Sequence, residues 1–222
     1  HGLDIDVLHW LRANFSIKEN TRGESSTVVV AIDEITHAAP PFKGIPKVMW
    51  TPQIAEVQAA VLKGGAKVFG WDIILPTSAS VYLNNRKFDQ ALLKGLISER
   101  RSGRIILGQS QVNTEVISPH RAFAMTVGGE ANIRNLDISV DDDGISRSLP
   151  LFFKMKTKSG KAIEVPGMAM ELAARATGEV PEPTSDGVQF LGNPVPGSQT
   201  REIVLNFDSV PGAIPTYSFS DL

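Results

Sequence analysis

Three short apolar runs constrain the fold more than any other feature of the sequence. They cover residues 27–33 (TVVVAID), 66–75 (AKVFGWDIIL) and 104–109 (RIILGQ). Each run has the length of a β-strand and contains Val or Ile residues, which favour strands. Because the runs are continuously apolar rather than alternating, they predict strands buried on both faces, as in a parallel sheet covered by helices.

The segments between these runs have the features of helices. Thr51 and Pro52 suit the N-cap and the first position of a helix, and Gly64 and Gly65 suit its end. Residues 88–97 (FDQALLKGLI) predict a second helix. A strand, a helix and a further strand in this order form a βαβ unit, whose crossover is nearly always right-handed. The first half therefore predicts an α/β arrangement.

The second half has a different pattern. Strand-like residues 131–138 and 145–154 flank the sequence Asp-Asp-Asp-Gly at 141–144. Asp-Gly between two such runs predicts a β-hairpin. Residues 166–176 have the spacing of a helix, and residues 201–207 (REIVLNF) predict a last strand.

We therefore expect one α/β domain over residues 1–222. It would have a mostly parallel central sheet with flanking helices in the first half and an antiparallel hairpin in the second half. Its expected parts are a helix at 1–15, a βαβ-type half at 27–110, and a hairpin, helix and closing strand at 131–222. Residues 177–197 are rich in Pro, Gly, Ser and Glu, and we expect them to form a long surface loop.

The charge balance and the lack of cysteine exclude several classes of function. The chain has 22 Lys and Arg against 24 Asp and Glu, whereas a nucleic-acid-binding protein normally has a basic face. Without cysteine, disulfide frameworks, thiolate metal sites and thiol catalysis are excluded. No run approaches the ~18–20 apolar residues of a membrane helix. Because the chain begins at His1 and not at Met, we expect it to be a piece of a longer protein.

Asp33, Asp72 and Trp50 are the candidate ligand-binding residues. The two aspartates come at or near the carboxyl ends of two predicted parallel strands, where ligand sites of open α/β sheets lie. Two carboxylates there could hold a divalent cation or act as acid and base. The alternative is that each one accepts backbone N–H groups at a loop or helix N-terminus. Trp50 ends an irregular segment at 36–50 and could line a pocket or close over the core.

Known catalytic and metal-binding motifs do not occur. The acidic residues around Gly144 lack the first and last ligands of a calcium-binding EF-hand loop, because Ser139 and Pro150 occupy those positions. A solvated hairpin turn is the better interpretation. The four histidines are scattered, and no serine lies in a G-x-S-x-G sequence. We therefore predict no catalytic residue, no metal site and no cofactor.

Six segments in the correct order resemble the CHASE domain of type two. They are residues 8–12 (LHWLR), 28–34 (VVVAIDE), 65–75 (GAKVFGWDIIL), 142–151 (DDGISRSLPL), 168–173 (MAMELA), and the closing residues 206–207 (NF) and 217–222 (YSFSDL). The resemblance spans essentially the whole chain, and the order of the segments carries it. This family is an extracellular sensor attached to bacterial adenylate cyclases, histidine kinases and serine/threonine kinases.

The resemblance implies a signal-sensing domain of a membrane receptor, lying in the periplasm or outside the cell, with a cyclase or kinase output as in two-component systems. It implies no catalytic residue in the domain itself. The expected partners are an unidentified small-molecule or ion ligand, the flanking transmembrane helices and a second copy in a homodimer, but no nucleic acid. Two alternatives stay open. One is a metal-dependent or acid/base hydrolase using Asp33 and Asp72, and the other is a structural or partner-binding spacer.

Overall fold

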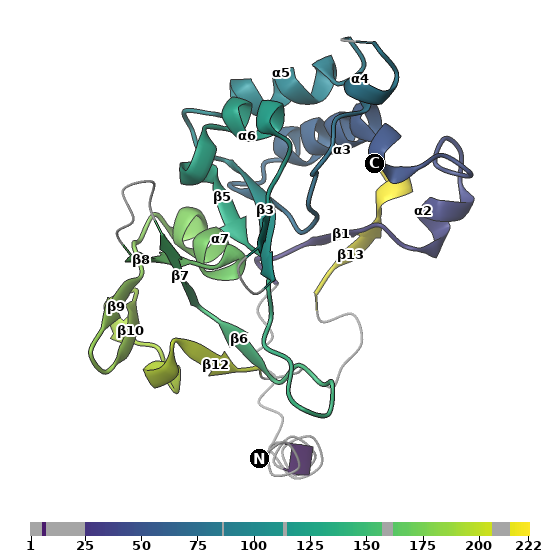
Figure 1. Cartoon of the computed structure of the whole chain (residues 1–222). Helices are drawn as coiled ribbons and strands as arrows, with labels where there is room; N and C mark the ends of the chain where they lie inside the picture. The colour runs from purple at the N-terminus through teal and green to yellow at the C-terminus, as the bar shows by residue number, and fades with distance from the viewer. Residues whose placement is uncertain (1–5, 8–24, 86, 113–114, 157–161, 206–213) are drawn as a thin grey trace. The chain divides into compact units, whose positions relative to one another are not determined.

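The structure is a computed structural model that describes residues 6–7, 25–85, 87–112, 115–156, 162–205 and 214–222 (Figure 1). The chain forms two compact units. The terminal unit consists of His1–Gly44, Ser139–Leu149 and Val204–Leu222, and the central unit consists of Ile45–Ile138 and Pro150–Ile203. The single domain expected over residues 1–222 stays a prediction, which one cooperative unfolding transition would support.

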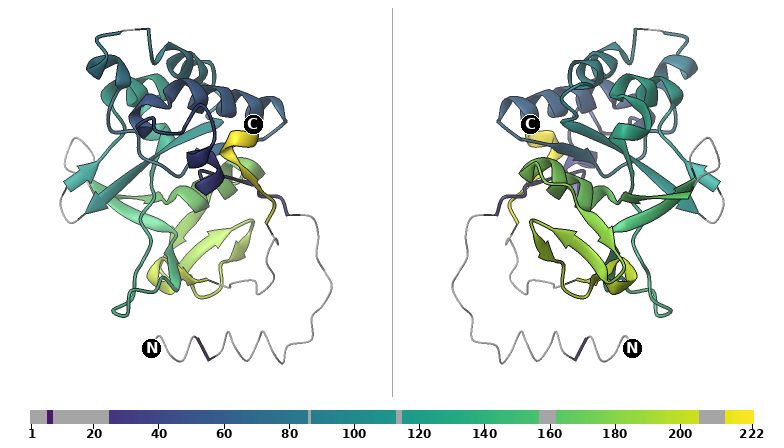
Figure 2. Two further views of the ribbon diagram at one scale, coloured as in Figure 1. Left: turned by 90° about the vertical axis from the view of Figure 1, so that its right-hand side faces the viewer. Right: turned by 90° about the vertical axis from the view of Figure 1, so that its left-hand side faces the viewer.

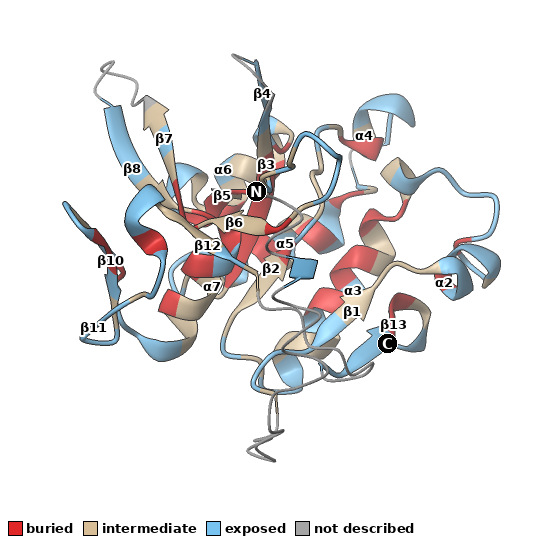
Figure 3. Cartoon of the chain, turned by 90° about the horizontal axis from the view of Figure 1, so that it is seen from below, coloured by how far each residue is buried: buried red, intermediate tan, exposed pale blue. Residues whose placement is uncertain are grey.

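The central unit is built on a mostly parallel sheet. β2 (Phe69–Trp71) and β5 (Ile133–Asn135) both pair in parallel with β3 (Ile105–Val112), which lies between them. β4 (Glu115–Ile117) pairs with the far end of β3 in the antiparallel sense. The first residues of β3, at 105–107, are almost fully buried (Figure 3). The predicted α/β fold class, with its mostly parallel sheet, is confirmed.

Four main helices surround this sheet. α3 (Thr51–Lys63), α5 (Gln90–Ser98) and α7 (Met168–Thr177) are the three helices that the sequence predicted in this unit. Trp50, and not Thr51, is the N-cap of α3, so this helix begins one residue earlier than expected. α6 (Arg121–Val127) was not predicted. Its seven residues are too few for a clear helical period.

Both faces of the sheet are covered by helices. Trp71 of β2 donates its indole N–H to the side chain of Gln58 on α3, with 3.1 Å between the nitrogen and the oxygen. The preceding residue, Gly70, faces the other way, and a Cβ atom there would lie 2.9 Å from a methyl group of Leu172 on α7. Since successive strand residues point to opposite faces, α3 and α7 lie on opposite sides of β2. Gly70 is required by the close approach of α7.

The second half of the central unit contains two small antiparallel sheets. β7 (Phe152–Lys156) and β8 (Ala162–Pro166) form a hairpin. β9 (Glu182–Thr184), β10 (Gly187–Phe190) and β11 (Asn193–Pro194) form a three-stranded sheet, drawn in yellow-green in Figure 2. The expected long loop at 177–197 was therefore wrong. These strands have only two to four residues each. Each of them contains a Pro or Gly residue, and both residue types are infrequent in strands.

A small hydrophobic core joins these sheets to α7. Its buried members are Leu151, Phe152, Met170 and Val188. Because Met170 belongs to α7 and Val188 to β10, this core holds the three-stranded sheet against the helix. At about 1.5–3 kcal/mol for each buried side chain of this size, these four residues stabilise the region substantially.

The Asp-Gly turn forms, but not between the strands that the sequence predicted. In the turn, the backbone N–H of Asp141 donates to the carbonyl oxygen of Ile145 at 2.9 Å, and Ser139 and Ser148 form an isolated antiparallel bridge. Residues 133–135 instead belong to β5 of the central sheet. The predicted pairing of 131–138 with 145–154 was therefore wrong, because the local signal specifies a turn and not the length of its arms.

The terminal unit contains a two-stranded parallel sheet. β1 (Val29–Ala31) pairs with β13 (Thr216–Ser218), and not with β2 as a βαβ unit would require. The prediction that residues 27–33 are buried on both faces was also wrong, since Val28 is 55% exposed and Val29 is 41% exposed. An apolar run favours a strand but does not determine which layers will cover it.

The remaining elements are short. α2 (Glu34–Ala38) follows β1, α4 (Ala79–Tyr82) precedes α5, and β6 (Ser148–Pro150) and β12 (Glu202–Val204) lie where the chain passes between the units. The single-turn helices are η1 (Lys47–Met49), η2 (Gly129–Asn132), η3 (Ser198–Thr200) and η4 (Phe219–Asp221). Of the helix expected at 1–15, only Asp6 and Val7 lie within the described residues, and both are helical.

Candidate functional site

Asp33 is the N-cap of α2 in the terminal unit. Its Oδ1 atom accepts hydrogen bonds from the backbone N–H of Thr36 at 2.8 Å, the Thr36 hydroxyl at 2.9 Å and the Ser218 hydroxyl at 2.9 Å. The backbone hydrogen bond from Thr36 is the largest cause that lowers the pKa of Asp33, and it outweighs the opposite effect of burial. Asp33 therefore caps the N-terminus of α2, which is the alternative considered for it from the sequence. Through Ser218 it also connects α2 to β13.

Asp72 directly follows β2 in the central unit. No hydrogen bond or ion pair joins its carboxylate to another residue in the described part of the chain. The residue is exposed, but the protein atoms around the carboxyl group desolvate it and raise its pKa. Asp72 and Asp33 belong to different units, and the common ligand site predicted for them stays a prediction.

Trp50 is buried at the N-terminus of α3. The residue is 2% exposed, and its indole N–H donates to the carbonyl oxygen of Ile45 at 3.0 Å. Of the two arrangements considered from the sequence, the structure has the one in which this ring closes over the core.

Arg147 is surrounded by carboxylates in the terminal unit. Its guanidinium group donates to Asp6, with 2.6 Å for the shorter of two contacts, and to Asp141 at 2.8 Å and Asp143 at 2.8–2.9 Å. The Arg147 side chain is only 3% exposed, whereas its three partners are 38–49% exposed. The hydrogen bonds that Arg147 donates to Asp6, Asp143 and Asp141 raise its pKa, and Arg147 in turn lowers the pKa of Asp143.

The Arg147 cluster corrects the interpretation of residues 141–144 as a turn that faces only solvent. Asp141 and Asp143 of this turn bind Arg147. They lie six and four residues before it in the sequence, so their pairing with Arg147 could have been predicted. The pairing with Asp6 could not have been predicted, because Asp6 lies 141 residues away in the sequence. Buried guanidinium groups need this kind of compensation, since an unpaired buried charge is costly.

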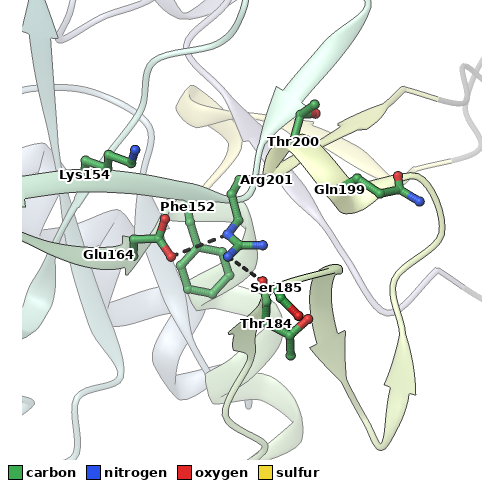
Figure 4. Close-up of a pocket in the computed structure, with 8 residues that line it drawn as sticks. All are labelled: Phe152, Lys154, Glu164, Thr184, Ser185, Gln199, Thr200 and Arg201. Carbon is green, nitrogen blue, oxygen red and sulfur yellow. Dashed lines mark hydrogen bonds and ion pairs between the residues drawn. The ribbon is translucent and has the colours of Figure 1, made fainter.

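A cavity of about 460 Å³ opens in the central unit (Figure 4). We call it the Arg201 cavity, and its lining residues are Phe152 and Lys154 of β7, Glu164 of β8, Thr184 and Ser185 at the end of β9, Gln199 and Thr200 of η3, and Arg201. No sequence pattern predicted this cavity, because four separate segments of the chain converge to form it. Neither Asp72 nor Trp50 lines it.

Within the described part of the chain, no group of three or more His, Asp or Glu side chains is arranged to hold a metal ion. None of the helices described here is both long enough and apolar enough to cross a membrane.

Comparison with known proteins identifies the family. The model of the CHASE2 domain matches residues 4–222, which is nearly the entire chain. The chain belongs to the CHASE2 domain family. CHASE2 domains are extracytoplasmic sensory domains and are not catalytic. No curated protein sequence and no solved structure matches the chain. The resemblance stated from the six sequence segments is thus confirmed.

Proposed function

We propose that this CHASE2 domain is the signal-sensing part of a transmembrane receptor, and that it regulates an adenylate cyclase or kinase output domain across the membrane. The match of residues 4–222 to the CHASE2 family is the observation that carries this proposal. The domain would lie in the periplasm or outside the cell, with transmembrane helices on both sides. A second copy in a homodimer is part of the same proposal, since cyclase and kinase output domains work in pairs.

The contact between Asp6 and Arg147 supports a route for the signal. Asp6 belongs to the N-terminal segment, which we expect to continue a membrane helix, and its carboxylate is held by two hydrogen bonds to Arg147. A change at Arg147 would therefore act directly on the N-terminal segment. A ligand can shift such an equilibrium only by as much as its affinities for the two states differ.

Of the three predicted ligand-binding residues, Asp72 is the best placed to contact a ligand. Its carboxylate is exposed and has no described partner, whereas the Oδ1 atom of Asp33 already accepts three hydrogen bonds and Trp50 is buried. A pKa raised by the surrounding protein is typical of functional carboxylates as well as of structural ones. We therefore propose that Asp72 contacts the ligand.

Membrane topology is the experiment that tests this function. Alkaline phosphatase, which is active only after export, is fused after Leu222 in the full-length parent protein. We expect an active fusion, and a fluorescent protein that folds only in the cytoplasm should stay dark at the same position. If the phosphatase fusion is inactive and the fluorescent-protein fusion at the same position is fluorescent, the sensor proposal is overturned. The hydrolase alternative would then be tested through Asp33 and Asp72.

A further inference from the structure

Arg201 is held in one position within the Arg201 cavity. Its guanidinium group donates to the carbonyl oxygen of Thr184 at 2.6 Å and lies 3.4 Å from a carboxylate oxygen of Glu164 (Figure 4). It also donates to the carbonyl oxygen of Gly187 at 2.5 Å. A guanidinium group has five N–H donors. Among the described residues these contacts use three of them, so two N–H groups of a fixed cation are left for a ligand.

The backbone of Arg201 is also unusual. Its φ angle is +67° and its ψ angle is 14°, which is a left-handed conformation that residues other than glycine rarely adopt. Two backbone hydrogen bonds hold it there. Its N–H donates to the carbonyl oxygen of Ser198 at 2.9 Å, and its carbonyl oxygen accepts from Leu151 at 2.7 Å. Strained residues of this kind occur often at ligand-binding positions, because the surrounding structure has to maintain them.

Lys154 supplies a second cation to the cavity. Its ammonium group forms no hydrogen bond or ion pair with any described residue, and it extends from β7, the same strand as Phe152. Together with Arg201 it gives the lining two positive charges against the single carboxylate of Glu164. The formal charge of the lining is therefore +1, and it favours a negatively charged ligand.

The other lining groups suit a polar molecule with a carbon skeleton. The hydroxyl groups of Ser185 and Thr200 and the amide of Gln199 have no described partners and can bind oxygen atoms. The ring of Phe152, which belongs to the small hydrophobic core, supplies an apolar surface beside them. An inorganic ion would leave this ring without contacts.

We propose that the Arg201 cavity binds a small organic carboxylate that carries hydroxyl or further carboxyl groups. The carboxylate would bind to the two remaining N–H groups of Arg201 and to the ammonium group of Lys154. The carbon chain would lie against Phe152, and its oxygen atoms would face Ser185 and Thr200. Planar guanidinium groups are suited to carboxylates, because two parallel N–H donors match the two oxygens. This proposal deepens the proposed sensor function by naming the chemical class of a ligand.

Calorimetric titration of the chain tests the assignment. The probes are malate, citrate and gluconate, with glucose as a neutral compound of similar size and inorganic phosphate as a simple anion. We expect saturable binding of at least one carboxylate, weakened as the salt concentration rises. Lys154→Gln should raise its Kd at least tenfold, and Glu164→Gln, which removes the repelling charge but keeps an acceptor for Arg201, should lower it. The matched control is Lys94→Gln on the exposed side of α5, which should leave the Kd unchanged.

Three results would overturn the assignment. The first is that none of the three carboxylates binds, the second is that glucose or phosphate binds as tightly as they do, and the third is that Lys154→Gln and Lys94→Gln have equal effects. Lys154 has no described partner, so its replacement should not impair folding, and circular dichroism checks this. None of these results would alter the alkaline phosphatase experiment, so failure of the ligand assignment and failure of the sensor function are distinguishable.

Discussion

Asp6 and Arg147 lie 141 residues apart in the sequence and are joined by two hydrogen bonds, of 2.8 Å to Nε and 2.6 Å to Nη2 of the guanidinium group. This is the bidentate geometry in which arginine binds carboxylates most strongly. It ties the N-terminal segment to the Asp141–Arg147 turn within the terminal unit. The contact is thus a stabilising interaction, and it lies on the route that we propose for the signal.

The first prediction concerns this contact. Arg147→Lys should lower the thermal unfolding temperature by several degrees, and by more than Asp6→Asn, because lysine cannot bind three carboxylates with the arginine fork. In a double-mutant cycle the two changes should not be additive. Asp142→Asn in the same turn is the control and should have little effect, since no partner of Asp142 is described. Additive effects of Asp6→Asn and Arg147→Lys would show that the pair does not form in solution.

The second prediction compares the two candidate aspartates. The lowered pKa of Asp33 means that it stabilises the folded state above the ordinary carboxyl pKa of about 3.9, and that this stabilisation is lost as the pH falls below it. Asp33→Asn should therefore lower the unfolding temperature at pH 7, and the difference from the original protein should shrink near pH 3. Thermal unfolding followed by circular dichroism across this pH range is the measurement.

Asp72 should behave in the opposite way. Its raised pKa means that the charged carboxylate is disfavoured in the folded state, so stability increases as the pH falls through the pKa of the folded protein. Asp72→Asn should leave the unfolding temperature at pH 7 unchanged or raise it slightly. A clear fall at pH 7 would mean that the Asp72 carboxylate is structural, and this would remove it from the proposed ligand contacts.

The third prediction concerns Asp89, a carboxylate that is 1% exposed in the central unit. It accepts hydrogen bonds from the hydroxyls of Thr51 at 2.6 Å and Ser78 at 2.5 Å, and from the backbone N–H of Ser80 at 3.0 Å. Burial by itself would raise the pKa of Asp89, but these hydrogen bonds outweigh burial and lower it. Asp89 thus joins the first turn of α3 to the segment that precedes α5.

Asp89→Ala should destabilise the protein by about 3 kcal/mol, because it leaves two buried hydroxyl groups without an acceptor. Asp89→Asn keeps an acceptor oxygen and should be milder. Since the folded pKa is lowered, the contribution of Asp89 is complete above about pH 3.9 and is lost progressively as the pH falls from there through the lower pKa of the folded protein. Urea unfolding at pH 7 and pH 3.5 measures both variants. An Asp89→Asn effect that is as large at pH 3.5 as at pH 7 would contradict a charged Asp89.

The sequence predicted those elements whose signals are local. α3 has its Pro near the first turn and its Gly at the C-cap, and β3 is a continuous apolar run, so both were found. The partner of β1 was not found, because Ala31 pairs with Ser218 near the other end of the chain and an apolar pattern specifies no partner. The site residues also divide into those with a local signal and those without one. Capping by Asp33 depends on Thr36 three residues later, whereas the Asp6–Arg147 contact and the Arg201 cavity depend on tertiary structure.

The fourth prediction concerns the backbone of Arg201. Arg201→Gly and Arg201→Ala both remove the contacts of the guanidinium group with Glu164 and with the carbonyl oxygens of Thr184 and Gly187. They differ in the backbone, because φ at this position is +67° and glycine adopts such angles without a steric penalty. Both variants should be less stable than the original protein, with Arg201→Gly more stable than Arg201→Ala by about 1 kcal/mol.

Chemical unfolding of the two variants in urea measures this difference directly. Leu191 supplies the control, since it also has a positive φ angle, of 54°, and is 53% exposed, so Leu191→Gly should stabilise the protein relative to Leu191→Ala without touching the cavity. If alanine is more stable than glycine at position 201 but not at position 191, the left-handed conformation of Arg201 is not maintained in solution. The guanidinium group would then not be fixed by its own backbone, and its position in the cavity would depend on the bound ligand.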